Sequence, residues 1–235
     1  KDHDGKEAED WVNVDSDLAY QGILNIASPP VQTFSFKNGY MYKWNENIHS
    51  WYKTSAVVNR RLYAGNVSYF EEFNPALLDN TVDIEEYRIS NYPDRILVSP
   101  PNKLDILPVE KYLLLARLDG QSIISLQGFK QYLFIYKSND LYILDCSGEG
   151  EELVQTFYGQ GLKSDLHVVK SQEAVYSLSD KGLFACNGEE ITNLSRDKIA
   201  ADYWRKNIYE RASRLMYDPE YNLLLITTKY DGTDD

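Results

Sequence analysis

Short runs of alternating apolar and polar residues, separated by turn residues, recur along most of the chain. The clearest example is "DGQSIISLQGFKQYLFIYKSNDLYILD", residues 119–145, in which Ser138, Asn139 and Asp140 join two apolar runs. Alternation with a period of two is typical of β-strands, and a short polar break between two such runs is typical of a hairpin. The pattern therefore predicts a chain built mainly from antiparallel strands.

The strand pattern repeats after residue 119. The stretches "QYLFIYKSNDLYILDC" (131–146) and "EAVYSLSDKGLFACN" (173–187) align with an offset of about 40 residues, which lies in the range of four-stranded propeller blades. A third, partial copy begins at "SRLMYDPEYNLLLITTKYDG" (213–232). The strands expected in the two full copies are 122–127, 131–137, 140–146, 152–158, 166–170, 173–178, 182–187 and 190–194.

Further strands are predicted before this repeat. An Asn-Gly pair divides two alternating runs within 31–44, which is a strong local signal for a hairpin. Residues 55–70 resemble a second strand pair, and 95–99 form a strand that ends at two prolines. Residues 102–118 fit either a loop that leads into a strand or a short helix.

These elements predict an all-β fold, in the main, made of β-propeller-like blades of four antiparallel strands. A single blade cannot cover both of its faces, so several blades must stack around an axis. We expect this chain to hold an incomplete propeller, and a two-sheet β-sandwich is the alternative. The insert at 196–212 is rich in Ala, Lys and Arg and predicts a short helix, with Ser195 as its N-cap.

Composition and pattern divide the chain into three parts. Residues 1–18 are acidic and poor in apolar residues, so we expect a flexible arm. Residues 19–55 form an N-terminal β-hairpin segment, and 56–235 form the β-propeller-like domain. The chain starts at Lys1 and stops just after a strand-like run, so we expect a fragment of a longer protein.

The aromatic residues favour β-structure and contact surfaces, since the chain has 19 Tyr, 8 Phe and 4 Trp but only 2 Met. Tyr132, Phe134, Tyr136 and Tyr142 alternate along two expected strands. We interpret these four rings as core between neighbouring blades.

Other residues are candidates for subunit contacts. Trp204, Tyr203 and Trp51 carry the large rings that are enriched at protein interfaces. Asn102 and Lys103 lie in a loop that we expect to be exposed, and loops are where propellers vary and bind. The inserts expected to make contacts are 74–88, 102–107 and 196–211.

The formal net charge of −12 argues against a surface that grips phosphates, because such a surface is rich in Lys and Arg. Basic pairs such as Arg60-Arg61 are isolated. Two explanations of the acidic surface stay open. It keeps the protein soluble, or it lines a passage that DNA crosses without sticking.

The sequence carries no pattern typical of catalysis, a metal or a cofactor. His3, His49 and His167 lack the spacing of a zinc site. Cys146 and Cys186 form no CxxC pair, and we interpret both as small buried side chains of a reducing compartment. The acidic stretches "DIEEY" and "GEGEEL" fit solvated turns better than catalytic pairs. We therefore expect no enzyme, no cofactor and no metal.

No apolar run approaches the ~20 residues of a membrane span, and no signal peptide is recognisable. We therefore expect no membrane-spanning segment.

Several stretches of the chain resemble one known family. They lie in family order between residues 57 and 228, and "DGQSIISLQGFKQYLFIYKSNDLYIL" (119–144) is the most characteristic. The family comprises the β-propeller structural proteins of tailed-bacteriophage necks and tails, which include tail nozzle (tail tubular B-type) proteins, crAss-like phage muzzle proteins and packaged-DNA stabilisation proteins. The other stretches are "VVNRRLYAGNVSYF" (57–70), "DRILVSPPNKLDILP" (94–108), "DKGLFACNGEEITNLSRDKIAADYW" (180–204) and "YDPEYNLLLIT" (217–227).

The resemblance implies a structural virion protein rather than an enzyme. Such a protein would form a homo-oligomeric ring that extends the DNA channel, retains packaged DNA and allows its ejection. Its partners would be other neck and tail proteins, and double-stranded DNA would pass through the lumen without specific binding. It would be part of the virion neck or tail, assembled in the cytoplasm of a bacterial host.

Two other functions are compatible with a propeller. A cellular interaction scaffold of the WD or kelch type would carry Gly-His and Trp-Asp dipeptides or double glycines, which are not recognisable here. A propeller-type glycosidase of a phage tail would need paired carboxylates beside aromatic rings, and no such pair can be singled out.

Overall fold

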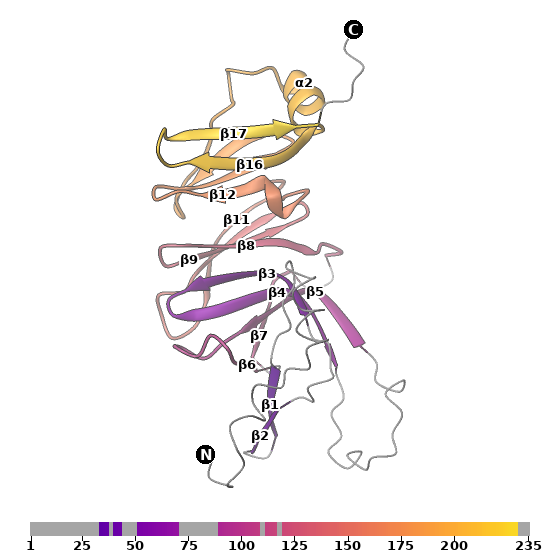
Figure 1. Cartoon of the computed structure of the whole chain (residues 1–235), viewed down its shortest axis with the longest axis vertical. Helices are drawn as coiled ribbons and strands as arrows, with labels where there is room; N and C mark the ends of the chain where they lie inside the picture. The colour runs from indigo at the N-terminus through magenta and orange to yellow at the C-terminus, as the bar shows by residue number, and fades with distance from the viewer. Residues whose placement is uncertain are drawn as a thin grey trace.

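The structure, a computed structural model, describes residues 33–37, 40–43, 51–70, 89–108, 111–116 and 119–229. The described chain is mainly β, as the sequence predicts, and it contains several four-stranded antiparallel sheets. The sheets follow one another along the long axis of the molecule, with β17 near one end and the β1–β2 hairpin towards the other (Figure 1). The predicted arm at 1–18 and the insert at 74–88 lie outside the described residues.

The N-terminal sheet has three strands in the order β2-β1-β6. Lys37 pairs with Tyr40 across the antiparallel β1–β2 hairpin, which confirms the hairpin predicted within 31–44. β6 runs parallel to β1. The bounds are β1 (Thr33–Lys37), β2 (Tyr40–Lys43) and β6 (Leu107–Pro108).

Sheet I has four strands in the order β3-β4-β5-β7. Asn59 and Arg60 connect β3 to β4 with φ angles of 44° and 60°, the left-handed conformation that a two-residue hairpin turn requires. The pair predicted at 55–70 is thus confirmed, and the segment at 102–118 contains short strands rather than a helix. The bounds are β3 (Trp51–Val58), β4 (Arg61–Phe70), β5 (Ile89–Val98) and β7 (Tyr112–Leu114).

Sheets II and III correspond to the two full copies of the predicted repeat. Their strand orders are β11-β10-β9-β8 and β12-β13-β14-β15, so each is a simple antiparallel meander. A 3₁₀ turn, η4 (Asp165–His167), precedes β12, so His167 lies at the entry to the strand rather than on it. The bounds are β8 (Ile123–Phe129), β9 (Tyr132–Lys137), β10 (Leu141–Asp145), β11 (Glu152–Phe157), β12 (Val168–Lys170), β13 (Val175–Ser179), β14 (Gly182–Cys186) and β15 (Ile191–Asn193).

Sheet IV is the hairpin of β16 (Ala212–Asp218) and β17 (Leu223–Thr228), which matches the predicted partial copy. A short helical segment precedes it, formed by α2 (Ala201–Tyr203) and the π-helix η5 (Trp204–Tyr209). The insert is therefore helical in part, but the prediction of Ser195 as N-cap is wrong. The N-cap is Ala200, and the Ser195 hydroxyl accepts a hydrogen bond from Leu183 N at 3.1 Å instead.

Apolar side chains fill the spaces between successive sheets. One cluster joins Tyr63 and Ile96 of sheet I to Leu133 of sheet II. A second cluster joins Phe134 of sheet II to Val175 of sheet III. β9 is buried at all six positions, because its two faces pack against two different sheets. The four rings predicted to form core, Tyr132, Phe134, Tyr136 and Tyr142, are all buried.

The first strands of sheets I to IV lie against one another in a series. β3 packs against β8, β8 contacts β12, and β12 contacts β16. The approach of β8 to β3 is so close that a Cβ added at Gly128 would lie 2.6 Å from the Val57 carbonyl oxygen. Successive sheets therefore meet most closely along their first strands.

Candidate functional site

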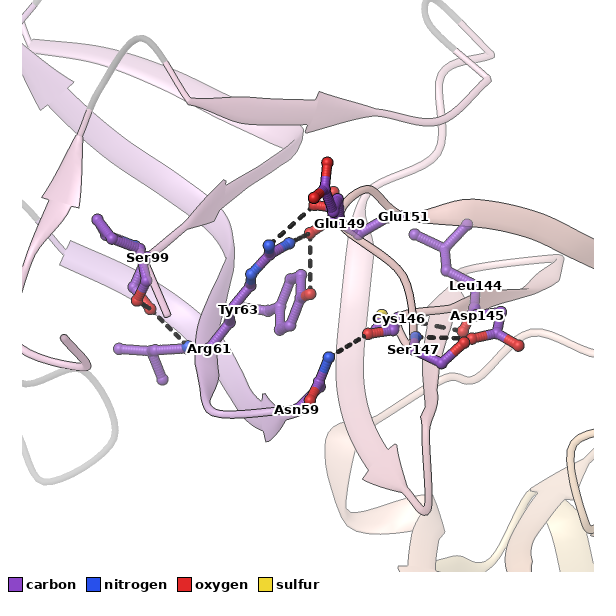
Figure 2. A network of polar contacts seen from close by, with 12 residues as sticks. Asn59, Arg61, Tyr63, Ser99, Leu144, Asp145, Cys146, Ser147, Glu149 and Glu151 are labelled. Carbon is purple, nitrogen blue, oxygen red and sulfur yellow. Dashed lines mark hydrogen bonds and ion pairs between the residues drawn. The ribbon is translucent and has the colours of Figure 1, made fainter. Parts of the chain in front are cut away.

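A polar network joins the β3–β4 hairpin of sheet I to the β10–β11 connection of sheet II (Figure 2). The Arg61 guanidinium donates to Glu151 Oε1 at 2.9 Å and to the Glu149 carbonyl at 2.8 Å. Tyr63 Oη donates to the same Glu151 oxygen at 2.9 Å, and Asn59 Nδ2 donates to the Cys146 carbonyl at 2.8 Å. Four hydrogen bonds thus hold the two sheets together at this end of the strands.

The Arg61–Glu151 ion pair is largely enclosed, since the side chains are only 10% and 8% exposed. A charge-assisted pair of this kind costs desolvation and requires both partners. Sequence reasoning assigned "GEGEEL" to a solvated turn, and for Glu151 that prediction is wrong. The partners lie 90 positions apart in the chain, so no local spacing could reveal the pair.

Burial changes the acid–base properties of two groups in this network. Burial raises the pKa of the Cys146 thiol to about 11, so the sulfur is protonated at neutral pH and a poor nucleophile. Burial also raises the pKa of the Tyr63 hydroxyl, which keeps it in the form that donates to Glu151. Both the Cys146 thiol and the Tyr63 hydroxyl are therefore in their neutral forms at neutral pH.

A second network surrounds Lys137, whose side chain is fully buried at the end of β9. Its Nζ donates to the Leu115 carbonyl at 2.6 Å and to Asp119 Oδ2 at 2.9 Å. Asp140, across the hairpin turn, accepts from Gln121 Nε2 at 2.7 Å and from Gly159 N at 2.9 Å. The network ties the segments before and after sheet II to its central hairpin.

The sequence contains one signal for this second site. Lys137 is the last residue of an otherwise apolar strand and stands three positions before Asp140. A charged residue in a buried strand is rare unless it is paired. Its acidic partner Asp119 lies 18 positions away, outside the hairpin, so the local pattern alone does not identify the pair.

The candidate contact residues of the helical insert differ in exposure. Trp204 is 3% exposed, packs with Leu178 and Leu215, and donates from Nε1 to the Ser179 carbonyl at 2.9 Å. Its side chain holds the insert onto sheet III and has little surface to offer a neighbouring subunit. Tyr203 is 58% exposed, so it has the surface that a contact residue needs.

The other candidate contact residues belong to sheet I and the loop that follows it. Asn102 and Lys103 are exposed, as expected for that loop. The backbone there is fixed, because Asn102 N donates to the Arg60 carbonyl at 2.8 Å. Trp51 begins β3 and its backbone pairs with Ser68, but its side chain lies outside the described atoms. Asn102 and Lys103 thus lie in the loop that follows sheet I, whereas Tyr203 and Trp204 lie in the helical insert that precedes sheet IV.

A hollow of about 470 Å³ lies beside the helical insert. Polar groups in its wall hydrogen-bond to one another within residues 193–196, since Asn193 Oδ1 accepts from Ser195 N and Arg196 N. No cluster of three or more His, Cys, Asp or Glu in the described ranges could hold a metal ion. The lining of the hollow also includes four charged residues, Lys181, Arg196, Asp197 and Lys198. It is lined by Lys181, Asn193, Ser195, Arg196, Asp197, Lys198, Ile199, Ala200, Ala201 and Trp204.

Three further sequence candidates are buried, whereas His3 and His49 lie outside the described residues. Cys146 and Cys186 are free thiols, each 1% exposed, as predicted for small core residues. His167 is 2% exposed, and its Nε2 lies 3.3 Å from the Ala212 carbonyl of β16. Within the part of the chain that the structure describes, no helix is long and apolar enough to cross a membrane.

Comparisons with known proteins define no family for the chain. No family model matches it, and no curated protein matches it. One similar solved structure is the extracellular domain of the putative one component system BT4673 from B. thetaiotaomicron, with 13% sequence identity and a TM-score of 0.40. The match covers 85% of this chain and 32% of that one. At this similarity the neighbour carries no argument about function, and the phage resemblance stays a prediction.

Proposed function

We propose that sheets I to IV are blades of a propeller-like array that acts as a structural component of a tailed-phage neck or tail. The observation that carries this proposal is the series of contacts between the first strands β3, β8, β12 and β16. In a propeller the first strand of each blade lies nearest the axis, and the blades pack face to face around it. The repeat of about 40 residues supports the same arrangement.

The polar networks support a structural rather than a catalytic role. Arg61, Glu151 and Lys137 are buried cations and anions whose hydrogen bonds all go to neighbouring segments of the same chain. Such networks stabilise one arrangement of the sheets relative to alternative arrangements. A protein that must keep its shape around a channel needs that rigidity.

The phage role itself comes from the sequence resemblance over residues 57–228. The protein would form a ring with other neck or tail proteins, extend the DNA channel, retain packaged DNA and let it leave during infection. The net charge of −12 supports a lumen that DNA crosses without sticking.

The test is native mass spectrometry of the purified chain together with negative-stain imaging. The proposal predicts closed rings of many copies with a central hole at least about 20 Å wide, because duplex DNA must pass, and no retention of linear duplex DNA by the rings at physiological salt. Particles that never exceed two copies, with and without linear duplex DNA, would contradict the ring.

Turnover of a bacterial surface polysaccharide would contradict the structural role in a different way. The assay is release of reducing ends from capsular and cell-wall polysaccharides, with heat-unfolded protein as the control. The proposal predicts no release above that control.

A further inference from the structure

The turn that joins β14 to β15, residues 187–190, begins with an asparagine that is followed directly by a glycine. Asn187 N donates to the Glu190 carbonyl at 3.3 Å, which closes the turn. The Asn187 side chain is exposed. Water therefore reaches the amide group of this side chain.

Two backbone donors point at the side-chain oxygen of this asparagine. Glu189 N donates to Asn187 Oδ1 at 3.0 Å, and Glu190 N donates to it at 2.9 Å. Hydrogen bonds of this kind hold an asparagine side chain against the backbone that follows it. Negative charge develops on the oxygen when a nucleophile adds to the amide carbon, and fixed N–H donors stabilise such charge. The turn therefore favours addition at Asn187 Cγ.

The nucleophile that can reach this carbon is the backbone nitrogen of the next residue. Addition of Gly188 N to Asn187 Cγ closes a five-membered ring, and a reaction between neighbouring groups of one chain has the advantage of proximity. Gly188 has a φ of 103° and places no side chain in the path of ring closure. Asparagine is a thermolabile residue in proteins, and this turn gives it both an adjacent glycine and two donors.

We propose that Asn187 is a site of spontaneous deamidation, a modification that needs only water. Gly188 N loses its proton to a base from the solvent and forms a bond to Asn187 Cγ. The bond between Cγ and the amide nitrogen then breaks, and the nitrogen takes up a proton and leaves as ammonia. Water hydrolyses the resulting cyclic imide at either carbonyl, which gives an aspartate or an isoaspartate at position 187.

The two products have different effects on the contact between sheets II and III. An aspartate keeps the length of the main chain and can still accept from the two N–H groups. An isoaspartate adds one carbon to the main chain before Gly188. Gly188 is buried, and a Cβ added to it would overlap the Tyr132 ring of sheet II. The lengthened main chain has no room there, so the isoaspartate should push the turn away from sheet II.

Peptide mapping of the wild-type chain during incubation at mildly alkaline pH measures the reaction at each asparagine. The comparison within the chain is Asn102, which is also exposed and has a φ of 62°, but is followed by Lys103. Asn187 should convert at least about tenfold faster than Asn102, because a lysine side chain hinders ring closure and glycine does not. An Asn187 that stays intact, or equal rates at the two positions, would overturn the proposal.

A pair of variants at position 190 tests the contribution of the donors. Glu190→Pro removes the N–H that Asn187 Oδ1 accepts, and Glu190→Ala removes the same carboxylate but keeps the N–H. The rate at Asn187 should fall about tenfold in the first variant and stay unchanged in the second. Equal rates in the two variants, both shown by circular dichroism to be folded, would contradict the role of the donors.

The effect on the sheets is measured on the isoaspartyl protein after chromatographic separation. Asn187→Asp is the matched control, because it carries the new charge without the additional carbon. The isoaspartyl protein should melt about 2–4 °C below this variant, which should itself melt within about 1 °C of the wild type. Equal melting temperatures of the isoaspartyl protein and the variant would contradict the displaced turn. None of these measurements depends on the phage role, so the two proposals fail separately.

Discussion

Sheets II and IV have the same apolar character but different surroundings. β9 of sheet II reads "YLFIYK" and is buried at every position. β17 of sheet IV reads "LLLITT" and alternates between half-buried and exposed positions. The difference lies in the neighbours, since among the described residues sheet II packs between two sheets and sheet IV packs against one. The burial of a strand in this chain therefore depends on the position of its sheet in the series of sheets, and not on the composition of the strand alone.

The largest effect is expected from Phe134→Ala in sheet II. Phe134 is fully buried, edge-on to Phe129 and stacked on Tyr136. Its loss should lower the free energy of unfolding by about 4 kcal/mol, because the cavity cannot collapse between two packed sheets. Leu225→Ala in sheet IV is the matched control and should change it by less than about 0.5 kcal/mol in the monomer. Urea unfolding measures both, and equal losses would contradict the comparison.

Trp204→Ala should cost about 3 kcal/mol of unfolding free energy, because its buried ring and its bond to Ser179 hold the insert on sheet III. Tyr203→Ala removes the adjacent exposed ring and should stay within about 0.5 kcal/mol of the wild type. Thermal and urea unfolding measure both variants. A fully stable Trp204→Ala protein would mean that the side chain serves a partner rather than the fold.

Glu151→Gln should lower the free energy of unfolding by about 2 kcal/mol, because it leaves the enclosed Arg61 guanidinium without its counter-charge. Glu149→Gln is the matched control. Arg61 bonds to the Glu149 carbonyl rather than to its side chain, so this change should be neutral. Urea unfolding in low and high salt measures the pair, and equal stability of the two variants would argue that the network does not join sheets I and II.

The smallest effect concerns the pH dependence of the contact between sheets III and IV. Burial lowers the pKa of His167 below its ordinary value of 6.5, so the native state favours the neutral ring. The unfolded chain binds the proton more readily, and stability present above about pH 6.5 is lost as the pH falls towards the folded pKa. Lys163 opposes protonation, Asp165 favours it, and the Tyr209 ring lies 6.1 Å away.

His167→Gln keeps an amide donor for the Ala212 carbonyl and removes the titration. Urea midpoints at about pH 7.5 and about pH 5.5 should differ more for the wild type than for this variant. An identical difference in both proteins would assign the pH dependence to other groups.

Local pattern predicted most strands of this fold. The alternating runs located the hairpins at 31–44, 55–70 and 131–146, and the aromatic rings of β9 and β10 lie in the core as expected. The sequence did not reveal features that depend on distant partners. Glu151 meets Arg61 across 90 positions, and Ser195 bonds to Leu183 rather than capping a helix. For Trp204, residue type suggested a contact surface, whereas packing against Leu178 and Leu215 makes it core.

The series of contacts between first strands also has a mechanical consequence. Sheets that contact only their nearest neighbours form a one-dimensional array. In such an array an inner sheet can unfold only after a neighbouring sheet has separated from it. In the part of the chain that the structure describes, sheet IV has one such neighbour and sheet II has two. Under pulling force, β16 and β17 should therefore separate first. In native-state hydrogen exchange, the amide protons of β16 and β17 should exchange first, and those of β9 should exchange only when the whole stack unfolds.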